Sequence, residues 1–160
     1  MGSGEEASAL QQTMLAEAQA VEGFVDLLKL EQSSLCRGDT DKLPGYAEQK
    51  LKFAAQLNEL AARRNAALTA QGFGSDRVGA DAWCAQHPEE EAATRAWTAV
   101  LALAGEAREL NRLNGELIRV RMQYNAKALE ALRGGATSLD LYGPDGQATT
   151  PGRRRINHTV

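Results

Sequence analysis

Apolar residues follow a helical repeat along most of the chain, and no segment alternates apolar and polar residues as a half-buried strand would. The first helix is predicted over residues 5–37. There, apolar residues recur every seven positions, as in the seam of a coiled coil: Met14, Val21, Leu28 and Leu35. Gly38 is suited to the left-handed conformation that commonly ends a helix. The pattern therefore predicts a long first helix with one apolar stripe.

A second helix is predicted from the following turn to about residues 71–72. Asp41 is the expected N-cap, because this start places Pro44 in the first turn, where proline is tolerated. The apolar positions again recur at helical spacing: Tyr46, Phe53, Leu57, Leu60, Ala61 and Leu68. Because the link around Gly38 is short, we expect the two helices to form an antiparallel hairpin.

The rest of the helical pattern predicts a short turn of helix and a third long helix. The short turn is expected to pack on the hairpin through Val78, Ala82 and Trp83. The third helix is expected to begin at Pro88, with three glutamates in the turn where the helix dipole favours them. It is expected to end at Arg133, before Gly134 and Gly135. At about 65–70 Å it is longer than a compact bundle of this size needs.

The third helix has an unusually wide apolar arc. At about 100° per residue its apolar side chains span about 200°, twice what one packing face requires. One stripe contains Leu103, Leu110, Leu113, Leu117, Val120 and Tyr124, and a second contains Val100, Ile118, Met122 and Leu129. Two neighbours in a bundle would bury both stripes. Alternatively, one stripe packs on the hairpin and the other receives a partner's helix. Asn114, Arg121 and Asn125 lie between the stripes, and the two asparagines either set the register of the incoming helix or are solvated at the edge.

Composition is consistent with one all-α domain. The 160 residues are 43% apolar and only 5% aromatic, with Ala and Leu dominating, which favours a thin helical core. The net charge of −3 is modest and the charges are interspersed, so no nucleic-acid partner is indicated. We expect a cytoplasmic protein without stable membrane insertion, because no apolar stretch would span a bilayer and the N-terminus does not resemble a signal peptide.

Residues that could carry chemistry are few and far apart. Cys36 and Cys84 fit no metal or redox spacing, and His87 and His158 have no ligand spacing to a cysteine or carboxylate. The sequence contains neither a glycine-rich phosphate loop nor a nucleophile elbow. We therefore expect no catalytic residue, no metal site and no cofactor.

Two stretches of the chain occur together at a specific spacing. The first lies on the third helix: Asn111, Arg112, Leu113, Asn114, Gly115, Leu117, Ile118, Asn125, Ala128, Leu129 and Leu132. The second is LYGPDGQ at residues 141–147, followed by basic residues near the C-terminus. Together they resemble the FlgN family of flagellar export chaperones. The hairpin also fits the family, but long hairpins are common, so it adds little.

The resemblance implies a non-enzymatic role in type III protein export. Such chaperones bind the C-terminal helix of the hook–filament junction proteins FlgK and FlgL and deliver them to the export gate protein FlhA. Residues 1–135 would form the helical chaperone domain, and residues 136–160 a flexible tail in which Tyr142 docks on the gate. Carried over by position, the client-binding residues would be Leu110, Asn114, Leu117, Ile118, Arg121, Met122, Asn125, Leu129 and Leu132.

The helical pattern alone also fits a generic coiled-coil adaptor or scaffold. An adaptor would need no tail motif, so the turn around Tyr142 favours the chaperone. A nucleic-acid-binding protein would need a basic stripe on one helix face, whereas the charged face of the third helix has both signs. The pattern leaves open whether the client-free protein is a monomer or a homodimer.

Overall fold

The computed structural model describes residues 2–139, and their regular structure is entirely helical, which confirms the all-α prediction. Contacts divide the chain into two compact units, Met1–Ile118 and Arg119–Val160, and the second is described as far as Leu139. The predicted tail from residue 140 on, including Tyr142, lies outside the described residues, whereas residues 136–139 belong to the last helix. The elements in chain order are α1 (Ser3–Arg37), the 3₁₀ turn η1 (Thr40–Lys42), α2 (Leu43–Ala70), α3 (Asp76–Gln86) and α4 (Glu91–Leu139).

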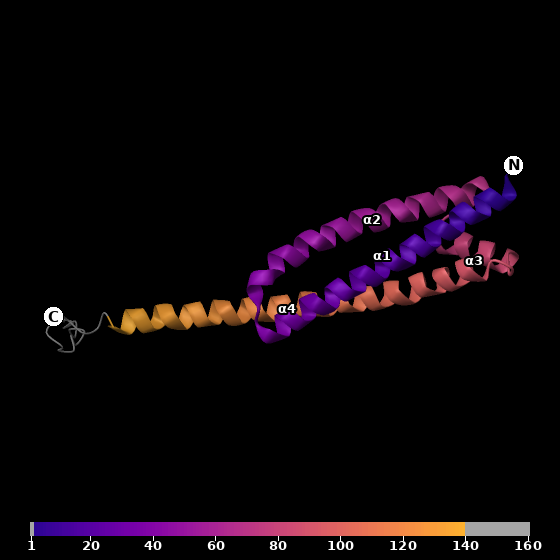
Figure 1. The fold of residues 1–160 in the computed structure, drawn as a ribbon. Helices are drawn as coiled ribbons and strands as arrows, with labels where there is room; N and C mark the ends of the chain where they lie inside the picture. The colour runs from indigo at the N-terminus through magenta and orange to yellow at the C-terminus, as the bar shows by residue number, and fades with distance from the viewer. Residues whose placement is uncertain (1, 140–160) are drawn as a thin grey trace, which may run out of the picture. The chain divides into compact units, whose positions relative to one another are not determined.

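In the first unit, α1 packs on both α2 and α4 (Figure 1). The predicted heptad seam of α1 provides these contacts, since each of its four positions is at most 5% exposed: Met14, Val21, Leu28 and Leu35. Two helices can use one seam because α2 and α4 contact it from different sides. The predicted antiparallel hairpin of the first two helices is confirmed.

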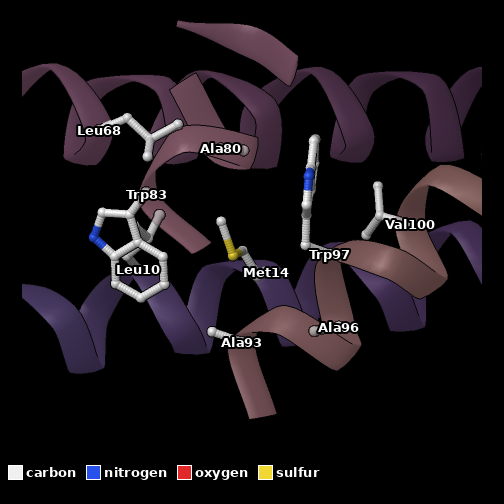
Figure 2. Close-up of a cluster of buried hydrophobic side chains, with 9 residues drawn as sticks. All are labelled: Leu10, Met14, Leu68, Ala80, Trp83, Ala93, Ala96, Trp97 and Val100. Carbon is white, nitrogen blue, oxygen red and sulfur yellow. The ribbon is translucent and has the colours of Figure 1, made fainter. Parts of the chain in front are cut away.

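The larger core cluster joins all four helices (Figure 2). It is formed by Leu10, Met14, Leu68, Ala80, Trp83, Ala93, Ala96, Trp97 and Val100. Trp83 is fully buried, and its indole Nε1 donates a hydrogen bond to Gln71 Oε1 at 2.8 Å. The ring of His87 stacks on Trp83 with centroids 4.5 Å apart. This cluster holds α3 on the hairpin, as predicted, but Val78 is 79% exposed and contributes nothing to that packing.

A second cluster lies farther along α1 and joins it to α4 and α2. Val21, Val25 and Leu28 of α1 are buried with Ala107 of α4. Partly buried side chains complete it: Phe24, Leu57, Leu103 and Leu110. Alanine at position 107 allows α4 to approach α1 closely, so side chains on both sides of it reach the core.

The predicted end of α1 and the first turn of α2 are confirmed, but the predicted cap is wrong. Gly38 adopts the left-handed conformation, with φ of 84°, and ends α1. Pro44 lies in the first turn of α2. Asp41, however, belongs to η1, which runs directly into α2, and the N-cap position is Lys42 without a capping side-chain bond. The 3₁₀ turn therefore replaces the side-chain cap.

Both predicted ends of the third helix are also wrong. Pro88 lies in a turn closed by a 3.0 Å hydrogen bond from the Glu90 amide to the His87 carbonyl, where proline is favoured, and α4 begins at Glu91. At the other end, α4 continues through Gly134 and Gly135 to Leu139, and neither glycine has a positive φ. Glycine lowers helix propensity by about 1 kcal/mol but keeps its backbone hydrogen bonds, so it need not end a helix.

A buried ion pair fixes α2 against α1. Arg64 of α2 donates to Glu17 of α1, and both side chains are only 7% exposed. The guanidinium of Arg64 also lies 4.8 Å from the ring centroid of Trp97 on α4. Removing one partner of such a pair would leave a buried charge uncompensated. The pair therefore ties three helices of the first unit to one arrangement.

Candidate partner-binding site

In the first unit, α4 buries side chains from both predicted stripes. Val100, from the second stripe, belongs to the larger cluster, whereas Leu103 and Leu110, from the first stripe, pack on the smaller one. Ala96 and Ala107 lie between the stripes and are each only 5% exposed. The interpretation that one stripe packs on the hairpin while the other stays free is therefore wrong for this part of α4. Both stripes border a single packing face.

Asn114 lies in the middle of this face and is completely buried. Its side-chain Nδ2 donates to the Leu28 carbonyl at 2.9 Å and to Glu31 Oε2 at 2.8 Å, both on α1. Glu31 is itself buried and also accepts a hydrogen bond from Lys50 of α2 at 3.3 Å. The Asn114 amide thus joins α4 to the hairpin within the first unit. It is not solvated at the seam's edge.

The second unit carries a concentration of exposed apolar side chains. Nine large hydrophobic residues are exposed in the described part of the chain, and five of them fall in 13 consecutive positions of α4: Val120 57%, Met122 66%, Tyr124 73%, Leu129 58% and Leu132 71%. Soluble proteins rarely keep a large contiguous apolar patch exposed unless it binds something. This density therefore marks residues 119–135 as the candidate partner-binding site.

These exposed side chains fall in two groups around the helix. At about 100° per residue, Met122, Asn125, Leu129 and Leu132 lie within about 80° of one another, and the half-buried Arg121 lies between this group and the pair Val120 and Tyr124. Val120 and Tyr124 lie toward one edge of the arc, and Met122 lies at the other. The helix therefore presents an apolar arc of about 200°, wide enough for one partner helix and more.

The predicted client-binding residues fall into three groups. Leu110, Leu117 and Ile118 are half-buried in the first unit, and Asn114 is buried there. In the second unit Arg121 is half-buried, whereas the remaining four are exposed: Met122, Asn125, Leu129 and Leu132. Tyr142 lies outside the described residues. The structure therefore brings together an exposed subset on residues 122–132, and all the roles stay predictions.

The polar side of α4 in the first unit is stabilised by its own ion pairs. Arg112 donates to Glu109 at 2.7 Å and to Glu116 at 2.8 Å. The hydrogen bond from Arg112 lowers the pKa of Glu109 below its ordinary value. Lys29 of α1 pairs with Glu106 at 2.8 Å, and this bond raises the pKa of Lys29. All these groups are well exposed, so they contribute little to stability and solvate this side of the helix.

Two surface pockets lie in the first unit, among the described residues. One, of about 230 Å³, lies between α1, α2 and α4 and is lined by Val21, Phe24, Leu57, Ala104, Ala107, Arg108 and Asn111. The other, of about 470 Å³, lies between α3 and the start of α4 and is lined by Cys84, Ala85, Pro88, Glu91, Thr94 and Arg95. Among residues 2–139, no group of three or more His, Cys, Asp or Glu side chains could hold a metal ion. No helix in this range is long and apolar enough to cross a membrane.

Comparison with known families decides between the remaining function classes. Residues 1–150 match the family model described as FlgN protein. The chain belongs to the FlgN family. No curated protein and no solved structure gives a significant match. FlgN proteins are non-enzymatic flagellar export chaperones, which confirms the family resemblance and the expectation that the chain is not an enzyme.

For this FlgN-family protein, sequence reasoning missed the two buried carboxylates of α1. Glu17 pairs with Arg64, and Glu31 holds both Asn114 and Lys50. A signal was present: Glu17 and Glu31 follow the seam residues Met14 and Leu28 by three positions, which is the neighbouring position of the same helix face. Charged residues are seldom buried unless paired, and the partners lie too far along the chain for a local pattern to reveal.

Asn114→Ala is expected to destabilise the protein by about 1–3 kcal/mol, because Glu31 loses a buried hydrogen-bond donor. The measurement is urea unfolding followed by circular dichroism. Asn111→Ala is the matched control, since Asn111 is exposed on the same helix and should change the free energy of unfolding by no more than about 0.5 kcal/mol. Equal stabilities of the two variants would mean that the bond from Asn114 to Glu31 contributes nothing to folding.

Proposed function

We propose that this FlgN-family chain is the cytoplasmic export chaperone of the hook–filament junction proteins FlgK and FlgL. It binds their C-terminal amphipathic helix along the exposed arc of α4 and delivers them to the export gate protein FlhA. The observation that supports this most is the cluster of five exposed apolar side chains between Val120 and Leu132 in a member of this family.

Within α4, we assign client contact to residues 119–135 and not to the earlier part of the helix. Before Ile118, Leu103, Ala107 and Leu110 of the apolar arc pack in the protein's own core, and Asn114 is bonded to α1. Met122, Asn125, Leu129 and Leu132 are exposed and share the arc. Leu110, Leu117 and Ile118 are half-buried, so a client would gain less apolar contact from them.

Covering this arc would protect both molecules. An amphipathic helix buries its apolar side only when another apolar surface receives it, and an exposed one promotes aggregation. Met122 suits such a site because its flexible thioether adapts to different side chains, which one surface serving two clients requires. The proposed chaperone therefore shields the client's terminal helix until export.

A coiled-coil adaptor is the second candidate, supported by the same exposed arc, which could receive another copy of the chain. Co-purification separates the two functions. Full-length chain mixed with FlgK should form a stable complex, and FlgK lacking its C-terminal helix should not. A chain that assembles only with itself and captures neither form of FlgK would favour the adaptor.

Tyr142→Ala is expected to separate holding from delivery. A tyrosine in a proline- and glycine-containing tail segment can bury its ring in a partner's pocket while its hydroxyl keeps a hydrogen bond. We expect the variant to bind the client with an affinity within about twofold of the wild type, and its free energy of unfolding to change by no more than about 0.5 kcal/mol. Its binding to FlhA should be weaker, and secretion of FlgK should be reduced. Tyr142→Phe, which keeps the ring, is the control and should retain most FlhA binding. Normal secretion by Tyr142→Ala would contradict the docking role.

A further inference from the structure

The first unit has an open apolar groove, which is the pocket of about 230 Å³ between α1, α2 and α4. Its apolar lining comes from Val21 and Phe24 of α1, Leu57 of α2, and Ala104 and Ala107 of α4. The two alanines place only methyl groups where α4 borders the groove, so the space between α2 and α4 stays open. Grooves of this kind receive the apolar side of another helix.

The second unit carries an apolar ridge with the spacing of a helix that binds in a groove. The ridge consists of Met122, Asn125, Leu129 and Leu132, which are all exposed and follow one another at i, i+3, i+7 and i+10. Because these side chains lie within about 80° of one another, a single groove can receive them together. Three of the four are large and apolar, which matches the lining of the groove.

Net charge favours contact between the ridge of one copy and the first unit of another. Residues 1–118 contain 11 Lys and Arg against 18 Asp and Glu, a net charge of −7. Residues 119–135 contain four basic residues against one acidic residue, a net charge of +3. Opposite net charges attract two surfaces, whereas two ridges of like charge repel each other. Charge therefore disfavours pairing of ridge with ridge.

The ridge does not reach the groove of its own chain, because both belong to one helix. α4 runs without interruption from Glu91 to Leu139. Ala104 in the groove and Met122 on the ridge are about five turns apart on it, so they would meet only if α4 broke between them. A second copy of the chain has no such restriction.

We propose that, in the client-free protein, the groove of each copy receives the ridge of a second copy, and that the client displaces it. This inference rests on the proposed function. A two-fold axis makes the contact reciprocal, so the dimer contains two ridge–groove contacts and closes on itself. Asn111 lines the groove and is exposed, so its amide offers Asn125 of the other copy a hydrogen-bond partner. Each contact is small, so the dimer is weak and dissociates on dilution.

Sedimentation equilibrium of the full-length chain, over about 1–300 µM, measures this self-association. We expect a monomer–dimer equilibrium with a dissociation constant on the order of 30 µM, so that the chain is monomeric at low micromolar concentration. A synthetic peptide of the terminal helix of FlgK should replace the dimer by a one-to-one complex, because the peptide covers the ridge.

Ala104→Leu separates the groove from the client site. The added side chain fills the groove and should weaken self-association at least about tenfold, while affinity for the FlgK peptide stays within about twofold, because residues 119–135 are unchanged. Ala102→Leu is the matched control, since it adds the same side chain at an exposed position on the other side of α4 and should change neither. Met122→Glu with Leu129→Glu alters the ridge and should weaken both.

Three results would overturn the inference. A chain that stays monomeric at every concentration but binds the FlgK peptide would reject the dimer and leave the client site standing. A dimer that Ala104→Leu leaves intact and the ridge variant dissociates would mean that ridge pairs with ridge. A dimer that survives both variants would lie elsewhere on the molecule. If the dimer depends on Ala104 and on the ridge but the chain never binds FlgK, the ridge–groove contact stands and the proposed function is rejected.

Discussion

A full-length chain carrying both Met122→Glu and Leu129→Glu is expected to bind the terminal helix of FlgK at least about 100-fold more weakly than the wild type. Both side chains are exposed within the apolar arc, so a bound client would bury the new carboxylates against apolar atoms. Burying an unpaired charge costs several kcal/mol, and about 2.7 kcal/mol corresponds to 100-fold in affinity. Titration calorimetry with the purified client measures the loss.

Folding should be unaffected, because glutamate has nearly the helix propensity of methionine and leucine, and neither side chain is buried. Far-UV circular dichroism of the variant should match the wild type. The matched control is Gln123→Glu with Ala126→Glu, which adds the same charge to exposed positions of the same segment outside the arc. If both double variants lose affinity equally, the loss is electrostatic, and the arc is not the contact. If the Met122 and Leu129 variant unfolds, these residues serve folding.

Trp83→Ala is expected to lower the free energy of unfolding by about 3–5 kcal/mol, the largest stability effect of any single substitution proposed for this chain. The indole is fully buried in a cluster that joins all four helices. Truncation would leave a cavity, remove the hydrogen bond to Gln71, and deprive His87 of its stacking partner. Urea unfolding followed by circular dichroism gives the change.

Val78→Ala is the control for Trp83→Ala, since Val78 is 79% exposed on the same helix. It should change the free energy of unfolding by no more than about 0.5 kcal/mol. A Trp83→Ala protein as stable as this control would mean that α3 does not contribute to the core. Client affinity of the folded Trp83→Ala protein should remain near the wild-type value, because Trp83 lies in the first unit.

The sequence predicted the long-range architecture because that architecture follows from periodicity. The heptad repeat from Met14 to Leu35 identified the buried side of α1, and the left-handed Gly38 identified its end. These features are local and depend on few competing interactions. The same reasoning placed a helix around Trp83 and packed it on the hairpin.

The ends of α4 were not predictable in the same way, because the residues there allow more than one local conformation. Pro88 suits both the first turn of a helix and the second position of a β-turn, and the structure has the turn. Gly134 and Gly135 suit a helix end, yet they continue the helix. The short-range preferences differ by about 1 kcal/mol, which flanking helical residues outweigh.

The apolar arc of the candidate site could be predicted from the sequence, but not which part of it is buried and which part is exposed. A wide apolar arc on α4 was evident from spacing, but the sequence left open whether two neighbours bury both stripes or one stripe receives a partner's helix. The structure shows that the earlier part of the arc, including Val100 and Leu110, packs on the protein's own hairpin, whereas the part from Val120 to Leu132 is exposed. Periodicity gives the angle of a residue but not whether a neighbour covers it.

Amide hydrogen exchange of the full-length chain, with and without bound FlgK, tests the proposed client site most directly. Exchange reports the opening of local structure, and a bound helix would slow it where it covers α4. The proposal predicts that residues 119–135 gain the largest protection, with Ser3–Arg37 and Leu43–Ala70 nearly unchanged. Protection that appears on α1 and α2 and is absent from residues 119–135 would contradict it.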